Sequence, residues 1–350
     1  MGSHRRVRAV VYLARMCLLA AVRGVALAWL LAGPALAAAP ALGAVVPGGP
    51  PSTDEGEETL FAAPTTRDHV GRIVVRVTLN GQGPFRFVVD TGASRSAISP
   101  RLAQTLGLEP GAESVVELNG ITGSALVPSV MIRTLQAGDL RIENTALPVV
   151  SAPVMAGADG ILGAAGLNSN SLYVDFQRDR VSITSGGGWR TRQGYFRIHG
   201  SRVAGGLVAL DATVDGVRVR AVIDTGSERT LGNVALRAAV DARRRARAEH
   251  AAKVYGATQE VASGDVQTTG VIVLDSVRID DVPIVYGDFH IFRVWGLQNS
   301  PALVLGMDVL GTVDSLAVDF LHGDVYLTGP GAINTGSTPV RSILTDRPRR

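Results

Sequence analysis

Short runs of alternating apolar and polar residues, separated by turn residues, make up most of the chain after about residue 65. Such runs predict β-strands, because side chains in a strand point alternately to the two faces of a sheet. The clearest runs lie in residues 72–99 and 207–233, where an Asn-Gly or Asp-Gly turn joins two strands. Helical patterns are confined to residues 99–107, with Ser99 as N-cap, and to Val234–Lys253. The pattern therefore predicts a mainly β protein with few helices.

The two hairpins belong to a longer repeat. Residues 159–184 contain GILG and residues 302–328 contain LVLG, and in each segment a Val-Asp-Phe strand and a final strand follow. The same features in the same order predict two similar units in one chain.

We expect the first unit at residues 65–187 and the second at residues 207–330. Glycines and mixed polarity between them predict a connector at residues 188–206, and a polar tail is expected at residues 331–350.

The first residues differ in composition from the rest of the chain. Arginines precede an alanine-rich apolar stretch that ends in the A-x-A pattern Ala35-Leu36-Ala37, which predicts a signal peptide at residues 1–37. A Pro-, Gly- and acid-rich stretch predicts a disordered linker at residues 38–64. We therefore expect an exported protein, periplasmic or secreted, which the membrane anchors only if the leader stays uncleaved.

Charge and cysteine usage narrow the possible partners. Five of the 34 basic residues lie in the predicted leader and none of the 31 acidic ones does, which leaves 29 basic and 31 acidic residues. This balance gives no reason to expect a nucleic-acid partner. The single cysteine, Cys17, also lies in the leader, and the six histidines are scattered, so we expect no disulfide, no cofactor and no metal site.

Each half carries an Asp-Thr-Gly tripeptide directly after an apolar strand. The two aspartates are Asp90 and Asp224. Similar halves predict a two-fold-like arrangement that brings both carboxylates into one cleft. Carboxylates about 3 Å apart share one proton, so that one acts as a base and the other as an acid. Such a pair can activate a water molecule to attack a peptide carbonyl.

The neighbours of the aspartates are expected to hold the pair rigid. Thr91 and Thr225 can bond to the backbone of the opposite half, and Gly92 and Gly226 let main-chain N–H groups approach the carboxylates.

One difference between the turns predicts an asymmetric pair. Ser227 stands three positions after Asp224, where the first half has Ala93. Only Asp224 is then expected to accept a side-chain hydroxyl bond, so we expect Asp224 to hold its charge more readily and Asp90 to be the acid.

These motifs resemble those of the aspartic peptidases, and among them the retropepsin-like bacterial group. VVDTGAS and AVIDTGS match the family's Asp-Thr-Gly-Ala/Ser signature, and GILG and LVLG match its hydrophobic-hydrophobic-Gly element, over about residues 65–330. The resemblance implies two β-barrel halves related by pseudo-twofold symmetry, each with a short helix. It implies that Gly163 and Gly306 pack behind the catalytic turns. It also implies that the active site needs no obligatory dimer, because both halves lie in one chain.

The resemblance also implies hairpin flaps over the substrate. The candidates are residues 116–127, with a tip from Gly120 to Gly123, and residues 254–264, which include Tyr255 and Gly256.

A further family feature is present in one half only. Asp308 follows Gly306 by two positions, as in retropepsins, whereas Ala165 follows Gly163, so the first half is expected to lack this polar brace.

By resemblance, the chain is an exported aspartic endopeptidase that acts on polypeptides through Asp90 and Asp224. The alternative is a catalytically inactive peptide-binding module of the same fold in the cell envelope. Both aspartates and both glycines are present, which favours the enzyme.

Overall fold

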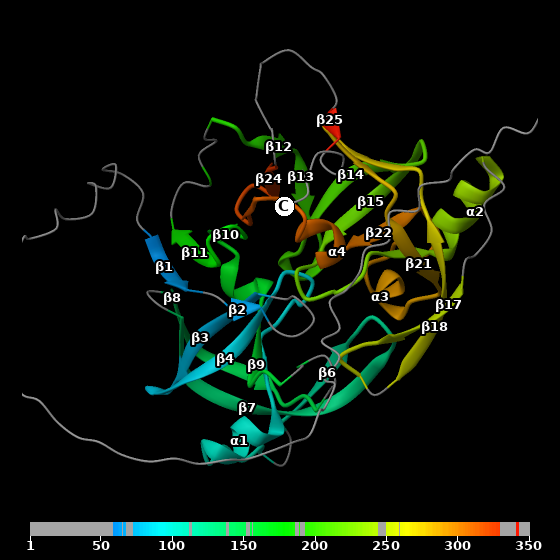
Figure 1. Cartoon of the computed structure of the whole chain (residues 1–350). Helices are drawn as coiled ribbons and strands as arrows, with labels where there is room; N and C mark the ends of the chain where they lie inside the picture. Colours follow the sequence, from blue (N-terminus) through cyan, green and yellow to red (C-terminus); the bar gives the residue numbers. More distant parts are fainter. Residues whose placement is uncertain are drawn as a thin grey trace, which may run out of the picture. The chain divides into compact units, whose positions relative to one another are not determined.

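The computed structural model describes residues 59–64, 66–67, 73–111, 114–137, 140–151, 155, 157–185, 189, 193–243, 250–258, 260–329 and 341–342. These residues are mainly β, as predicted, and form three sheets with a few short helices (Figure 1). None of the described helices is long and apolar enough to cross a membrane. The predicted leader lies outside the described residues.

The first half is built on an eight-stranded sheet. Its strands are β2 (Thr66–Arg67), β3 (Ile73–Leu79), β4 (Gln82–Asp90), β5 (Ala97–Ile98), β6 (Val115–Asn119), β7 (Ser124–Ala137), β8 (Leu140–Pro148) and β9 (Gly160–Gly163). Asn80 and Gly81 join β3 to β4 with φ of 51° and 79°, as a two-residue hairpin turn requires. α1 (Pro100–Thr105) begins as predicted, because the Ser99 hydroxyl accepts the Leu102 N–H at 3.1 Å.

The second half is built on an eleven-stranded sheet. Its strands are β13 (Gly200–Arg202), β14 (Val208–Val214), β15 (Val217–Ile223), β16 (Leu231–Asn233), β17 (His250–Tyr255), β18 (Val261–Thr268), β19 (Val271–Leu274), β20 (Val277–Asp280), β21 (Pro283–Gly287), β22 (Ala302–Leu305) and β25 (Arg341–Ser342). β25 lies in the expected polar tail.

The helices of the second half are α2 (Val234–Arg243), α3 (His290–Val294) and α4 (Met307–Leu310). Single 3-10 turns occur at η2 (Ala164–Leu167) and η3 (Ala204–Gly206). The helix expected as far as Lys253 was wrong at its end, because β17 pairs with β18 along its whole length. Sheet pairing outweighs the helix preference of its two alanines.

A third sheet joins the two halves. Its six strands are β1 (Thr59–Pro64), β10 (Asn170–Asp175), β11 (Arg180–Ser185), β12 (Phe196–Ile198), β23 (Ser315–Asp319) and β24 (Asp324–Thr328). They lie in the order β1-β11-β10-β23-β24-β12, so the Val-Asp-Phe strands β10 and β23 meet at the centre. The outer strands β1 and β12 come from the expected linker and connector. Each repeat therefore begins with a strand that precedes its first hairpin.

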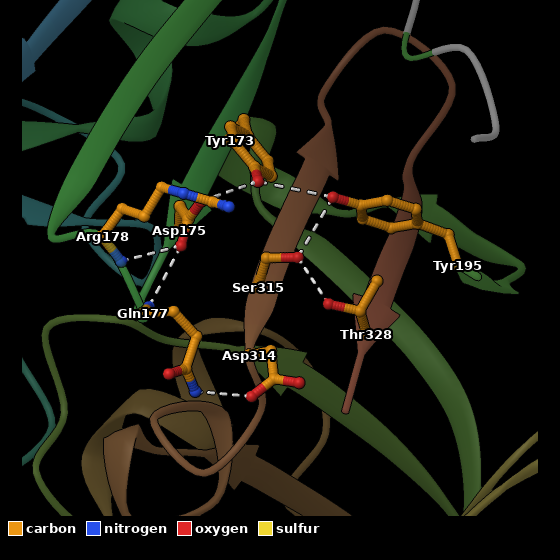
Figure 2. Close-up of polar contacts among 8 residues, drawn as sticks. All are labelled: Tyr173, Asp175, Gln177, Arg178, Tyr195, Asp314, Ser315 and Thr328. Atoms are coloured by element: carbon orange, nitrogen blue, oxygen red, sulfur yellow. Dashed lines mark hydrogen bonds and ion pairs between the residues drawn. The ribbon is translucent and has the colours of Figure 1, made fainter. Parts of the chain in front are cut away.

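Hydrogen bonds between side chains reinforce this junction (Figure 2). The Tyr195 hydroxyl bonds to that of Tyr173 at 3.4 Å and accepts the Ser315 hydroxyl at 3.1 Å, and Ser315 bonds to Thr328 at 2.6 Å. Burial raises the pKa of Tyr173 above its usual range, and the hydrogen bond with Tyr195 raises it further. The Tyr173 hydroxyl therefore stays protonated. This chain of bonds runs from β10 of the first half to β24 of the second, which fixes the halves against each other.

Candidate active site

Each aspartate of the two Asp-Thr-Gly turns lies at the end of a buried strand. β4 runs parallel to β9, with Asp90 opposite Gly163. β15 runs parallel to β22 in the same way, with Ile223 opposite Leu305, and Asp224 follows directly. The apolar residues before each aspartate fill the core, which anchors the carboxylates at the strand ends.

Each carboxylate accepts two backbone N–H groups from its own turn. The donors are Gly92 (2.9 Å) and Ala93 (2.8 Å) for Asp90, and Gly226 (2.8 Å) and Ser227 (3.0 Å) for Asp224. These bonds fix the orientation of both side chains within their own turns.

The structure brings the two aspartates together, as the repeat predicted. Their carboxyl groups are hydrogen-bonded to each other. A Cβ atom at Gly92 would overlap the carboxyl group of Asp224, and one at Gly226 would overlap that of Asp90. Each glycine therefore lies against the aspartate of the opposite half, and a larger residue at either position would push the pair apart.

The two aspartates differ in burial. Asp224 is 6% exposed, whereas Asp90 is half-buried. Burial raises the pKa of Asp224 well above its ordinary value, and the nearby Asp90 carboxylate and the bond to it raise that pKa further. The two N–H groups of the Asp224 turn oppose this shift. Burial therefore favours the protonated form of Asp224.

The raised pKa of Asp224 gives no support to the expectation that this residue holds its charge more readily. The Ser227 hydroxyl donates to the Arg229 carbonyl at 2.7 Å and not to Asp224. A short serine side chain readily bonds to the backbone two residues further along the chain. Burial, and not a hydroxyl bond, makes the pair asymmetric.

The two threonines link the halves beneath the aspartates, as predicted. The Thr91 hydroxyl accepts the Thr225 N–H at 3.0 Å and donates to the Ile223 carbonyl at 2.9 Å. Reciprocally, the Thr225 hydroxyl accepts the Thr91 N–H at 3.1 Å and donates to the Val89 carbonyl at 2.8 Å. Both threonines are at most 1% exposed, so these four bonds are shielded from water.

The glycine elements pack behind the turns. A Cβ at Gly163 would lie 2.5 Å from the carbonyl carbon of Arg95, and one at Gly306 would lie 2.5 Å from that of Arg229. Both turns therefore press onto a residue without a side chain, as the resemblance implied.

An extra carboxylate braces the second half only. Asp308 accepts the N–H of Thr230 at 2.9 Å and its hydroxyl at 2.7 Å. The same hydroxyl accepts the Gly306 N–H at 3.2 Å. Burial raises the pKa of Asp308, and the bonds from Thr230 and the charge of Arg229 oppose the shift.

The first half keeps only part of this arrangement. Ser96 accepts the Gly163 N–H at 3.1 Å, but Ala165 stands where the second half has Asp308. The difference between the halves that the sequence predicted is therefore present.

A cavity of about 630 Å³ contains both aspartates. The first half contributes its Asp-Thr-Gly turn and the tip of its hairpin, Asn119, Gly120 and Ile121, and the second half contributes most of the wall. Glu228, Arg229, His250 and Lys253 also line the cavity. Among the residues described, no three His, Cys, Asp or Glu side chains are grouped as a metal site.

Part of the cavity wall was missed from sequence. Leu231, Val266, Val285, Ile291 and Trp295 form an apolar surface on one side. α3 and the residue after it supply Ile291 and Trp295, and Trp295 packs edge-on against Phe292 with ring centres 6.1 Å apart. These residues come from separate strands and a helix without a shared motif, so no local signal marks them.

The expected flaps are hairpins whose tips meet at the cavity. Gly120, Tyr255 and Gly256 line it, whereas Gly123 closes the first tip by accepting the Gly120 N–H at 2.9 Å. The two tips are joined by a bond of 3.0 Å between the hydroxyls of Thr122 and Thr258. Tyr255 is 57% exposed, so most of its side chain faces solvent.

A comparison with family models agrees with this geometry. A model described as aspartyl protease matches the chain twice, at residues 75–165 and at residues 210–309. The two matches cover more than half of the chain, and each contains one Asp-Thr-Gly turn and one glycine element. No curated protein matches the chain.

Proposed function

The chain belongs to the aspartyl protease family, and we propose that it is an endopeptidase that hydrolyses peptide bonds with water activated between Asp90 and Asp224. One observation carries the proposal. A buried and a half-buried carboxyl group, hydrogen-bonded to each other, line one cavity shared by two halves. This pairing keeps one proton between two carboxyl groups, which general acid and base catalysis requires.

The proposed reaction begins with the proton on Asp224 and the negative charge on Asp90, which the raised pKa of Asp224 supports. A water molecule gives a proton to Asp90 while its oxygen attacks the carbonyl carbon of the peptide bond. The carbonyl oxygen takes the proton of Asp224, which yields a neutral tetrahedral diol. The C–N bond then breaks as Asp90 returns its proton to the leaving nitrogen and a diol hydroxyl returns one to Asp224.

The rest of the site supports this role. Eight hydrogen bonds of the two turns, four to the carboxylates and four between the threonines and the opposite half, hold the pair in place before substrate binds. Such preorganisation is what a catalytic pair needs. The N-terminal composition supports export to the periplasm or the medium.

The test is cleavage of denatured casein between about pH 3 and pH 8, the range over which carboxyl pairs change protonation. We expect wild type to cleave casein and the Asp90→Asn and Asp224→Asn variants to be inactive while folded. Asp211→Asn is the matched control, because the Asp211 side chain is 83% exposed and lies outside the cavity.

Activity that survives in either dyad variant would contradict the mechanism. If wild type and all variants are inert but bind peptide, the inactive peptide-binding module takes its place.

A further inference from the structure

The tip of the first-half hairpin is fastened to the second half at three nearby residues. Asn119 is bonded to His290 of α3, with 3.1 Å between Oδ1 and Nε2. Thr122 bonds to Thr258 at 3.0 Å. Between them, Ile121 packs onto an apolar cluster that belongs to the second half.

The cluster beneath Ile121 forms part of the cavity wall. Leu231, Val266, Val285 and Ile291 belong to the cluster and also line the cavity that holds the aspartates. Trp295 packs against the same cluster and lines the same cavity. Ile121 therefore lies on an apolar surface of the cavity that contains both aspartates, where a side chain of a bound peptide could pack.

The contact is one-sided. The second-half tip offers the small residues Gly256, Ala257 and Thr258 where the first has Ile121. The corresponding apolar cluster of the first half, which includes Val150 and Ile161, contains only first-half residues among those described.

We propose that Ile121 occupies the second-half apolar pocket in place of a substrate side chain, and that a peptide must displace it to bind. The pocket walls are aliphatic with one indole, and they hold an isoleucine, so the displacing side chain is a leucine, isoleucine or valine. The inference rests on the proposed function for the identity of the ligand as a peptide, but it concerns binding and not hydrolysis.

Displacement predicts that a smaller residue at this position strengthens peptide binding. The probe is a capped hexapeptide whose central Leu-Leu bond is replaced by a non-cleavable CH2–NH bond. Its dissociation constant is measured by calorimetry with wild type and with Ile121→Ala. We expect Ile121→Ala to bind about fivefold more tightly, the ratio for losing the burial of roughly half an isoleucine side chain.

Two controls separate displacement from a general loosening of the hairpin. Leu126→Ala removes a 77% exposed side chain from β7 of the same hairpin and should leave the dissociation constant unchanged. A probe with glycines in place of both leucines should gain nothing from Ile121→Ala, because it places no side chain in the pocket.

Binding that is unchanged or weaker in Ile121→Ala overturns the inference, as does an equal gain in Leu126→Ala or an absence of binding in both proteins. Hydrolysis of the same peptide with a normal bond is measured alongside. Cleavage with an unchanged dissociation constant rejects the inference and leaves the proposed function intact. Tighter binding without cleavage keeps the inference and counts against the function.

Discussion

Replacing Thr91 by valine tests how strongly the threonine bonds hold the two halves together. Valine has nearly the same shape, but it lacks the hydroxyl that accepts the Thr225 N–H and donates to the Ile223 carbonyl. Both backbone groups would then lose these partners at a site where Thr91 is 1% exposed. Each buried polar group left without a partner costs about 1–3 kcal/mol, so we expect the loss of both partners to lower the free energy of unfolding by about 2–6 kcal/mol.

The pair of threonines also predicts non-additivity. Thr225→Val should lower the free energy of unfolding about as much as Thr91→Val, because the two partners of its hydroxyl, the Thr91 N–H and the Val89 carbonyl, are the counterparts of the two partners of Thr91. Each threonine side chain accepts the backbone N–H of the other threonine, so the two sites belong to one hydrogen-bond network. The double variant should therefore lose about 1–2 kcal/mol less unfolding free energy than the two single variants lose together.

Urea unfolding followed by tryptophan fluorescence and circular dichroism measures these differences. Thr105→Val is the control, because its exposed hydroxyl donates only to the Arg101 carbonyl within α1. We expect the control to change the unfolding free energy by less than about 0.5 kcal/mol. A Thr91→Val variant as stable as the control would refute the argument that these bonds join the halves.

Three further predictions concern carboxyl groups, two that are buried and one that is introduced. Because burial raises the folded-state pKa of Asp224, its contribution to stability is fully present below the unfolded value of about 3.9 and is lost as pH rises. Asp224→Asn should therefore gain stability relative to wild type between about pH 4 and pH 7 in thermal melts, and a difference that shrinks with pH would contradict this sign. Asp308→Ala should lower the free energy of unfolding by about 1–3 kcal/mol, because the buried Thr230 N–H loses its acceptor. Ala165→Asp should change stability by about 1 kcal/mol or less in the stabilising direction, since Ser96 gains a carboxylate neighbour, and urea unfolding of both variants checks the contrast.

The dyad could be predicted from sequence because its signals are local and repeated. An Asp-Gly or Asn-Gly turn fixes the register of each hairpin, and the register places Asp90 and Asp224 at equivalent strand ends. Once the halves are equivalent, Thr91 and Thr225 must face each other. The glycines follow from the same closeness, since each lies against the opposite carboxyl group.

Features that depend on distant partners were not predictable. His250–Lys253 has the composition of a helix, and only its pairing with β18 makes it part of a strand. Thr59–Pro64 has the composition of a linker, and it forms a strand because it pairs with the edge of β11. β12 adds to β24 in the same way, so the repeat is one strand longer than its motifs show.

The unequal burial of the two carboxyl groups could not be predicted either, because the two turns give them the same bonds. Asp90 and Asp224 each accept two backbone N–H groups at nearly equal distances, so hydrogen bonding within the turns does not distinguish them. What differs is the surrounding wall, most of which comes from the second half and leaves Asp224 6% exposed. A two-fold-like backbone thus supplies the pair of carboxyl groups, and the unequal packing of side chains around it makes their burial, and with it their tendency to hold a proton, unequal.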